Sequence, residues 1–169
     1  MSLILTYEQQ QSIKAISTNN AHRYEQIAAE IEETDLKALL GTPLLQAIQE
    51  TPENHTNLLD GDTFEDCNGN TIKHKGLRYV LAYLNYAKYI SESSVQDTFS
   101  GFAVKQMEDS NPANEGTILR LKKENQKIAM TEWELIKEYL TEKKYYLWYI
   151  SKSKKPHMPK MTFLRNTAK

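Results

Sequence analysis

The chain has 169 residues, of which 40% are hydrophobic and 25% are charged, as is typical of one globular domain with its own core. No run of about 18 apolar residues is present, so we expect no membrane-spanning helix. A single cysteine excludes a disulfide within the chain and favours a reducing compartment. The first ten residues lack the basic start of a secretory signal.

The net charge of −1 conceals an asymmetry along the chain. Eight of the 21 cations lie between Lys143 and Lys169, where there is no Asp or Glu, which leaves 13 cations against all 22 acids in the first 142 residues. An acidic body with a basic tail is typical of a segment that interacts with a partner. A tail that is only solvated and aids solubility remains the alternative.

The first part of the chain has the hydrophobic period of helices. Thr6 and Gln9 have the spacing of a capping box, which predicts a helix over residues 7–16. A second helix is expected from Ala21, where apolar residues recur at i, i+3, i+4 and i+7. Gly41 is a suitable residue to end it, because glycine readily adopts the left-handed conformation found after helices.

A third, shorter helix follows directly. Thr42 has the side chain of an N-cap and Pro43 fits the first helical turn, which predicts a helix over residues 44–50. Pro52 then ends this helix, because proline lacks the backbone N–H that would continue the hydrogen-bond ladder.

The next segment, LLDGDTFEDCNGNTIKHKG, has a different character, because glycines and polar residues interrupt it. Asn68-Gly69 is a strong signal for a two-residue type I′ turn, so we expect a hairpin at about 63–75 with strands over 63–67 and 70–75. A lone hairpin is only marginally stable in water. This hairpin must therefore lie on helices or pair with another chain.

The stretch GLRYVLAYLNYAKYIS predicts a helix over 77–93 that is apolar on two sides. Its first stripe is aliphatic and suits the core of the domain: Leu77, Val80, Leu81, Leu84 and Ala87. Its second stripe holds three tyrosines and an isoleucine at i, i+4, i+7 and i+11: Tyr79, Tyr83, Tyr86 and Ile90. Aromatic residues are enriched at protein interfaces, so this tyrosine stripe is either a second core face or a subunit interface.

An extended arm is expected at about residues 95–111, which show no helical stripe. Within it, Phe102 and Val104 alternate with less apolar neighbours. At about twenty residues, such a segment is long for a loop inside a compact domain, and loops of this length tend to be functional. We expect Phe99, Phe102 and Val104 to pack on a neighbouring subunit.

A last helix is expected from Asn114 to about residue 149 and would be about 54 Å long if unbroken. A small domain does not need that length, so the helix either bends or projects. The remainder, 151–169, predicts an extended basic tail, because Pro156 and Pro159 prevent helix formation. We expect this tail to dock on a partner through its cations, prolines and apolar anchors: Lys154, Lys155, Pro156, Met158, Pro159, Met161, Phe163, Leu164 and Arg165.

The search for chemical motifs is negative. The six glycines are too dispersed for a phosphate-binding loop, and the four histidines lie at least 19 residues apart, which fits no local metal-ligand spacing. DGDTFEDCNGN is not an EF-hand loop, because alignment on Gly69 puts Phe64 at the first ligand position. Cys67 follows Asp66, which disfavours the thiolate. We expect no catalytic, metal or cofactor site and no enzyme, although catalytic triads need not be local in sequence.

Several of these segments resemble the head–tail connector (adaptor) proteins of tailed bacteriophages. The similarity covers roughly residues 20–141. It includes LKALLGTPLLQAI, the hairpin that leads into the aromatic helix, the arm SVQDTFSGFAVKQMEDS, and the helix TILRLKKENQKIAMTEWELIKEYL. The tail falls outside the resemblance, and its role is inferred from its own residues. We expect a helical connector domain over 1–150 followed by the basic tail over 151–169. The expected fold class is therefore mainly α: a small helical bundle with one inserted β-hairpin, an extended arm and an extended tail.

The resemblance also implies a structural function without enzymatic activity. Such proteins form a ring, commonly of twelve copies, beneath the portal of the capsid, where they extend the DNA channel and bind the next neck or tail protein. We therefore expect a homo-oligomeric virion protein of the phage neck, assembled in the host cytoplasm, with no cofactor and no membrane contact. Its partners would be the portal protein, the adjoining neck or tail protein and the DNA in transit.

A nucleic-acid-binding protein is the alternative function. The segment KKYYLWYISKSKK mixes cations with aromatic residues, a composition found in nucleic-acid-binding surfaces. The acidic body opposes this reading, because it would repel a DNA duplex from most of the surface.

Overall fold

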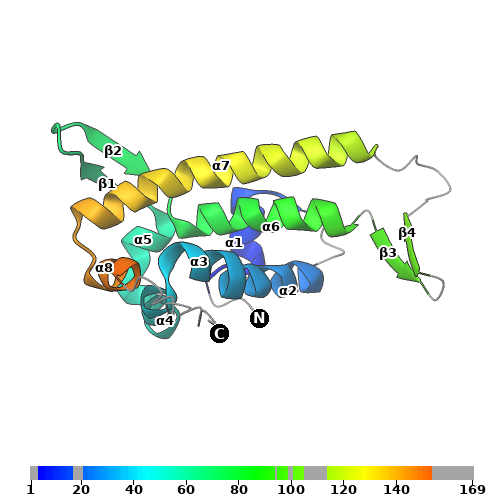
Figure 1. The fold of residues 1–169 in the computed structure, drawn as a ribbon, viewed down its shortest axis with the longest axis horizontal. Coiled ribbons are helices and arrows are strands. Elements are labelled where there is room, and N and C mark those ends of the chain that lie inside the picture. Colours follow the sequence, from blue (N-terminus) through cyan, green and yellow to red (C-terminus); the bar gives the residue numbers. More distant parts are fainter. Residues whose placement is uncertain (1–3, 17–20, 94, 99–100, 105–113, 154–169) are drawn as a thin grey trace, which may run out of the picture.

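The structure is a computed structural model that describes residues 4–16, 21–93, 95–98, 101–104 and 114–153, with side chains placed in 4–16, 21–92 and 114–150. Three layers of helices build the fold (Figure 1). The central helix α6, Leu77–Ser93, lies antiparallel to the long helix α7, Glu115–Glu142. Helix α2, Ala21–Ile31, lies on the other side of α6, so α6 is covered from two sides.

The N-terminal segment contributes α1, Tyr7–Ile13, and the elements after α2. The predicted capping box is confirmed, because the Thr6 side chain accepts a hydrogen bond from the Gln9 backbone N–H and the Gln9 side chain accepts one from Thr6. Helix α1 ends three residues earlier than predicted. The predicted second helix begins as α2 and continues through a π-helical turn, η2 (Glu32–Leu36), into α3 (Lys37–Leu40). It ends at Gly41 as expected.

Helix α4, Thr42–Glu50, follows with Pro43 in its first turn. Its N-cap is Gly41 rather than Thr42, so no side chain caps this helix. Pro52 ends α4 but not the helical course of the chain, because a 3₁₀ turn, η3 (Pro52–His55), and α5 (Thr56–Asp60) come next. Proline is well suited to the first position of such a turn, where its missing N–H has no partner to lose.

The inserted hairpin pairs β1, Asp62–Glu65, with β2, Thr71–His74, in antiparallel register. The predicted type I′ turn is wrong. The Asp66 N–H donates to the Asn70 carbonyl and the Gly69 N–H to the Asp66 carbonyl, both at 3.0 Å, so the loop has three residues. Gly69 has φ +81°, as expected where a type I turn is followed by a left-handed residue.

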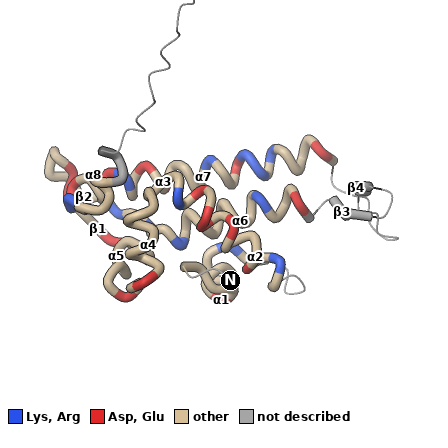
Figure 2. Tube along the Cα trace, turned by 60° about the horizontal axis from the view of Figure 1, so that its bottom comes forward, with Lys and Arg blue, Asp and Glu red and all other residues tan. Residues whose placement is uncertain are grey.

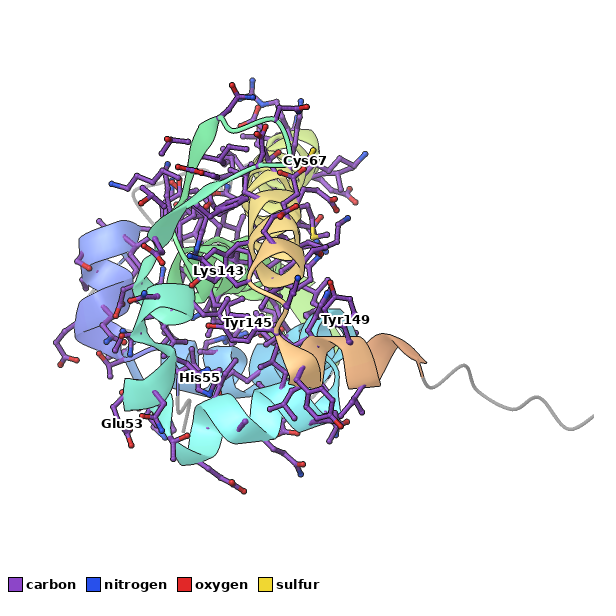
Figure 3. All side chains as sticks on the ribbon, turned by 90° about the vertical axis from the view of Figure 1, so that its left-hand side faces the viewer. Glu53, His55, Cys67, Lys143, Tyr145 and Tyr149 are labelled. Atoms are coloured by element: carbon purple, nitrogen blue, oxygen red, sulfur yellow. The ribbon has the colours of Figure 1, made fainter. Side chains whose placement is uncertain are left out.

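The hairpin lies on the C-terminal half of α7, which satisfies the expectation that it needs a supporting surface. Phe64 and His74 pack against Tyr139, with ring centroids 5.7 and 4.4 Å from that of Tyr139. The hydroxyl of Tyr139 also donates to Asp62 at 3.3 Å. The tip of the hairpin with Cys67 extends away from the helical core (Figure 3).

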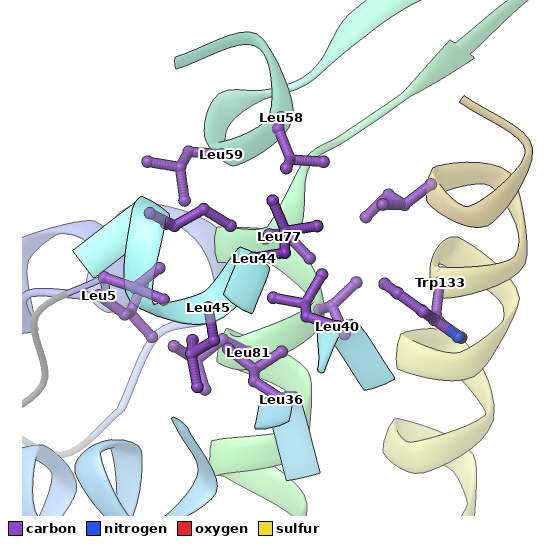
Figure 4. Packing of buried hydrophobic residues seen from close by; sticks show 14 of the residues in the cluster. Leu5, Leu36, Leu40, Leu44, Leu45, Leu58, Leu59, Leu77, Leu81 and Trp133 are labelled. Carbon is purple, nitrogen blue, oxygen red and sulfur yellow. The ribbon is translucent and has the colours of Figure 1, made fainter. Parts of the chain in front are cut away.

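The core is built mainly from leucines that separate short helices contribute to one cluster. Figure 4 shows side chains from η2 to α5 meeting those of α6, with Trp133 of α7 closing one side. Several of these side chains are fully excluded from solvent: Leu36, Leu40, Leu44, Leu58, Leu59, Leu77 and Leu81. Each fully buried leucine contributes about 2 kcal/mol of transfer free energy, so this cluster fixes the position of α6.

A second hairpin occupies the expected arm. Strands β3, Val95–Thr98, and β4, Gly101–Val104, pair antiparallel and lie beyond the C-terminal end of α6 (Figure 1). The expected extended conformation is present in these strands, whereas their pairing was not predicted. Residues 105–111 of the arm lie outside the described residues.

The long C-terminal helix bends sharply, one of the two predicted possibilities. Helix α7 ends at Glu142, and α8, Tyr146–Ser153, starts after a turn in which Lys144 has φ +50°. Helix α8 packs on α4, and the rings of Trp148 and Trp133 meet edge to face at 5.7 Å. The helix continues to Ser153, past the predicted start of the tail at 151, and 154–169 lie outside the described residues. A mainly helical fold with an inserted hairpin is thus confirmed.

Candidate interaction surfaces

The part of the chain with described side chains contains no group of three or more His, Cys, Asp or Glu residues placed to hold a metal ion. Among the described helices, none is long and apolar enough to cross a membrane. The thiol of Cys67 is exposed at the hairpin tip. The features that stand out are surfaces rather than a reactive pocket.

The two stripes of α6 have different environments, as their compositions suggest. In the aliphatic stripe, Leu77, Val80, Leu81 and Ala87 are buried and Leu84 is partly buried. In the tyrosine stripe, Tyr79, Tyr83, Tyr86 and Ile90 are all only half-buried. The tyrosine stripe is therefore neither a full core face nor an open surface.

Two lysines partly cover the tyrosine stripe. The Nζ of Lys14, after α1, lies 4.8 Å from the ring centre of Tyr86 and 5.5 Å from that of Tyr83. The Nζ of Lys75 lies 4.4 Å from the ring centre of Tyr79 and donates to its hydroxyl at 3.2 Å. The hydrogen bond with Tyr79, followed by burial, raises the pKa of Tyr83 to about 12.

An open groove extends from Tyr79 toward α7. Lys75 and Tyr79 form one wall, and the other wall comes from five residues of α7: Glu124, Lys127, Ile128, Thr131 and Glu132. Ile128 is 40% exposed here. The groove thus joins an aromatic residue, an exposed aliphatic residue and charges of both signs, a composition that suits a protein partner.

The base of the inserted hairpin is held by buried polar groups. Glu132 is buried and accepts a hydrogen bond from the Lys75 backbone N–H. His74 is fully buried, and its burial lowers the pKa of the imidazole, an effect that the carboxylate of Asp62 opposes. A backbone hydrogen bond from Thr63 holds the pKa of Asp62 below its usual value. These contacts fix the base of the hairpin against α7.

A polar layer between α1, α2 and α6 was not predicted. Gln10 donates to the Ala82 carbonyl, and Asn85 donates to the Tyr24 carbonyl, both at 3.3 Å. Gln10, Asn85 and Tyr24 are all buried, and the Tyr24 ring stacks on Tyr89 at 4.3 Å. The one sequence signal was Asn85 itself, an amide in the middle of an apolar helix.

A row of cations on α7 was also missed. Arg120, Lys123 and Lys127 are exposed and lie on the side of α7 opposite to the buried residues that face α6. Figure 2 shows that Lys and Arg positions gather on the half of α7 nearest the β3–β4 hairpin. Their i, i+3, i+7 spacing was visible in the sequence, but the acidic balance of the body concealed this local excess of positive charge.

At the other end of the molecule, α8 has an exposed side. Tyr146 is 74% exposed, and Tyr149 is partly exposed with its hydroxyl donating to the Thr141 carbonyl at 3.2 Å. Tyr145 faces His55 of η3 across the interior, and Figure 3 shows this pair beneath Lys143. Of the aromatic residues in KKYYLWYISKSKK, Trp148 therefore belongs to the core while Tyr146 is free to contact a partner.

The structure does not bring the predicted interface residues together into one site. The tyrosine stripe lies along α6, and Phe102 and Val104 lie in β4 at the far end of the molecule. Phe99 lies outside the described residues. All predicted docking residues of the tail lie there too: Lys154, Lys155, Pro156, Met158, Pro159, Met161, Phe163, Leu164 and Arg165.

Comparison with protein families gives one match. A family model covers residues 36–158, from η2 to beyond α8, and it describes a family of unknown function, DUF6712. Comparisons with curated proteins and with solved structures give no match.

Proposed function

Because the chain belongs to DUF6712, a family of unknown function, we propose its role from its own surfaces: it is a structural subunit of a phage neck ring. In this role it joins the portal vertex of the capsid to the tail and lines the channel through which DNA passes. The resemblance of the sequence to head–tail connector proteins implies this function, and the shape of the subunit supports it.

The observation that carries the proposal is the position of the β3–β4 hairpin. It lies beyond the end of α6, away from the leucine core, and among the described elements it packs on α6 and on itself. A two-stranded hairpin is marginally stable in water without a supporting surface. A neighbouring subunit supplies such a surface, and strands presented in this way are common in protein assemblies.

A closed ring needs two different surfaces that fit one another, because a head-to-tail contact repeats around the axis. The arm with Phe102 and Val104 provides a protruding surface at one end of the subunit. The tyrosine stripe and the groove beside it provide a recessed surface along α6. These surfaces remain the ones on which we expect neighbouring subunits to meet.

Contact with the portal or with the next neck protein is assigned to the basic tail. Its cations favour an acidic surface on the partner, and its apolar residues then hold the contact. Tyr146, exposed at the start of α8, lies on the path from the helical body to this tail. The body remains acidic, which suits a channel wall past which DNA must slide without adhering.

Nucleic-acid binding is the second candidate, favoured by the exposed Tyr146 and Tyr149 next to Lys143 and Lys144. Exposed aromatic rings beside cations are typical of surfaces that stack on bases and neutralise phosphates. The burial of Trp148 in the core reduces the aromatic surface available for this role. Salt-sensitive binding of the purified protein to duplex DNA at moderate ionic strength would favour this candidate.

The proposed function is tested by single-particle imaging of the concentrated full-length protein. We expect closed rings with a central channel for the native protein. We expect no rings for Phe102→Asp, whose thermal unfolding should match that of the native protein because the arm lies outside the core. An equal loss of monomer stability in Phe102→Asp would assign the arm to the fold instead, and absence of rings in the native protein would contradict self-assembly.

A further inference from the structure

The outer side of α7 carries positive charge that its own fold does not use. Arg120, Lys123 and Lys127 are exposed and lie in one line along the helix. Within the described part of the chain, none of them forms an ion pair with a carboxylate, whereas Lys37, Lys88 and Lys137 do. Cations three and four residues apart repel one another and weaken a helix. We call residues Arg120, Lys123 and Lys127 the α7 stripe.

Apolar side chains flank the α7 stripe. Leu119 is 48% exposed at its start, and Met130 is 40% exposed at its end. Lys127 of the stripe also lines the groove beside Tyr79, together with Glu124 and Ile128, so the α7 stripe borders that groove. A row of cations bordered by exposed apolar residues has the composition of an interface for an acidic protein surface, not that of a purely solvated helix face.

An acidic surface lies on the opposite side of the molecule. Residues 30–37, at the end of α2 and in η2, contain four acids and one lysine. Glu33 and Asp35 are exposed on the side of η2 that faces away from α6, because Ile31, Glu32 and Leu36 are buried toward the core. Helices α2 and α7 cover opposite sides of α6 (Figure 1). Because the exposed residues of α7 and of η2 both lie away from α6, we infer that the two charged surfaces face in opposite directions. Glu30 lies closer to α6, where it forms an ion pair with Lys88 at 2.6 Å, and is not part of this surface. Glu33 has only a long contact of 3.9 Å with the exposed Lys37, and such exposed pairs contribute little. We call Glu33 and Asp35 the η2 patch.

We propose that the α7 stripe of one copy binds the η2 patch of the next copy. Two complementary surfaces on opposite sides of a subunit produce a head-to-tail contact, which closes into a ring when the rotation between copies allows it. Complementary charge sets the register of such a contact and speeds its formation. The inference rests on the proposed ring and adds a charged contact to the one proposed there between the arm and the tyrosine stripe.

Two pairs of charge reversals test the contact. Lys123→Glu/Lys127→Glu reverses the α7 stripe, and Glu33→Lys/Asp35→Lys reverses the η2 patch. All four side chains are exposed, so both variants should fold as the native protein does, which circular dichroism can verify. Lys73→Glu is the control for the stripe variant, because it reverses the charge of an exposed lysine that lies outside every proposed contact surface.

Self-association is measured by sedimentation velocity at low salt. Each reversed variant alone should associate at least about ten-fold more weakly than the native protein, because like charges now meet at every contact, whereas the control should not change. An equimolar mixture of the two reversed variants should recover association. In the mixture, the acidic stripe of one variant meets the basic patch of the other, and the two unaltered surfaces also meet.

The outcomes separate this contact from the ring proposal. Native assembly that neither reversal weakens would overturn the contact while leaving the ring intact. Loss of association that the mixture does not restore would also overturn it, because the two surfaces would then act separately. Weaker binding of the stripe variant to duplex DNA, with unchanged self-association, would assign the α7 stripe to nucleic acid. A native protein that stays monomeric at every concentration would contradict both proposals.

Discussion

Two glycines determine how closely the inserted hairpin approaches the helices. Gly61 and Gly76 both have positive φ, at +102° and +87°, and they lie where the chain enters and leaves the hairpin. A Cβ at Gly76 would collide with the carbonyl oxygen of Leu59, and one at Gly61 with that of His74. Backbone atoms cannot move aside as a flexible side chain can, so both positions require glycine.

We predict that Gly76→Ala destabilises the protein by about 3 kcal/mol or more, because it combines an unfavourable φ with a backbone clash. Gly69→Ala is the matched control: Gly69 also has positive φ, at +81°, but no atom lies within 4 Å of its added Cβ. That substitution should cost only about 1 kcal/mol. Urea denaturation of both variants measures the difference, and equal losses would show that the close approach does not matter.

His74 makes stability depend on pH. Its burial lowers the pKa of the imidazole in the folded state, so the unfolded chain takes up a proton first as the pH falls. Stability should therefore decrease as the pH drops below about 6.5, and the loss should level off below the folded-state pKa. His55 is shifted in the same direction by burial and adds to this effect.

The variant His74→Phe should remove most of this pH dependence. It keeps a ring against Tyr139, and neither ring nitrogen of His74 hydrogen-bonds to a described residue, so no bond is lost. Denaturation midpoints at pH 8 and pH 5 for native protein, His74→Phe and His22→Gln provide the comparison. His22 is exposed, and its variant should keep the native pH dependence. An unchanged pH dependence in His74→Phe would contradict the assignment.

At the scale of elements, the turn between α7 and α8 sets the shape of the C-terminal region. The sequence predicted that one long helix must bend or project, but it gave no position for the bend. The break occurs at Lys143 to Tyr145, where the left-handed residue is Lys144 rather than a glycine or asparagine. The cause is tertiary: Trp148 must reach Trp133, and α8 must reach α4.

We predict that Trp148→Ala destabilises the protein by about 3 to 5 kcal/mol, because it leaves a large cavity beside Trp133. Tyr146→Ala, two residues earlier on the same helix, should change stability by less than about 0.5 kcal/mol, because Tyr146 is 74% exposed. Thermal or urea unfolding distinguishes the two. A large loss in Tyr146→Ala would show that α8 packs in a different orientation.

At the scale of the whole molecule, local signals predicted most of the helices. The capping box at Thr6, the end at Gly41 and the helix over 77–93 are all found, because each depends on neighbouring residues. The β3–β4 pairing was not foreseen, since strand pairing depends on residues that single-sequence patterns do not link. The α7 stripe and the η2 patch were missed for a related reason: whether they face opposite ways depends on the packing around α6.

Deletion of residues 151–169 is expected to separate folding from docking. The aromatic contact of Trp148 lies before the deletion. The free energy of unfolding of the helical body should therefore stay within about 1 kcal/mol of that of the native protein. Attachment to the portal or to the adjoining ring should be lost, and attachment of the native chain should weaken as salt screens the tail. Normal occupancy of the truncated chain in assembled particles would make the tail a solvated appendage.

The neck-ring account is tested most directly by the molar ratio of this chain to the portal protein in purified tailed particles. Quantitative mass spectrometry of such particles gives that ratio without any variant. A subunit that forms a ring beneath the portal should be present at about one copy per portal subunit, because stacked rings that share an axis commonly share their symmetry. Absence of the chain from intact particles, or a ratio far below this value, would contradict the account.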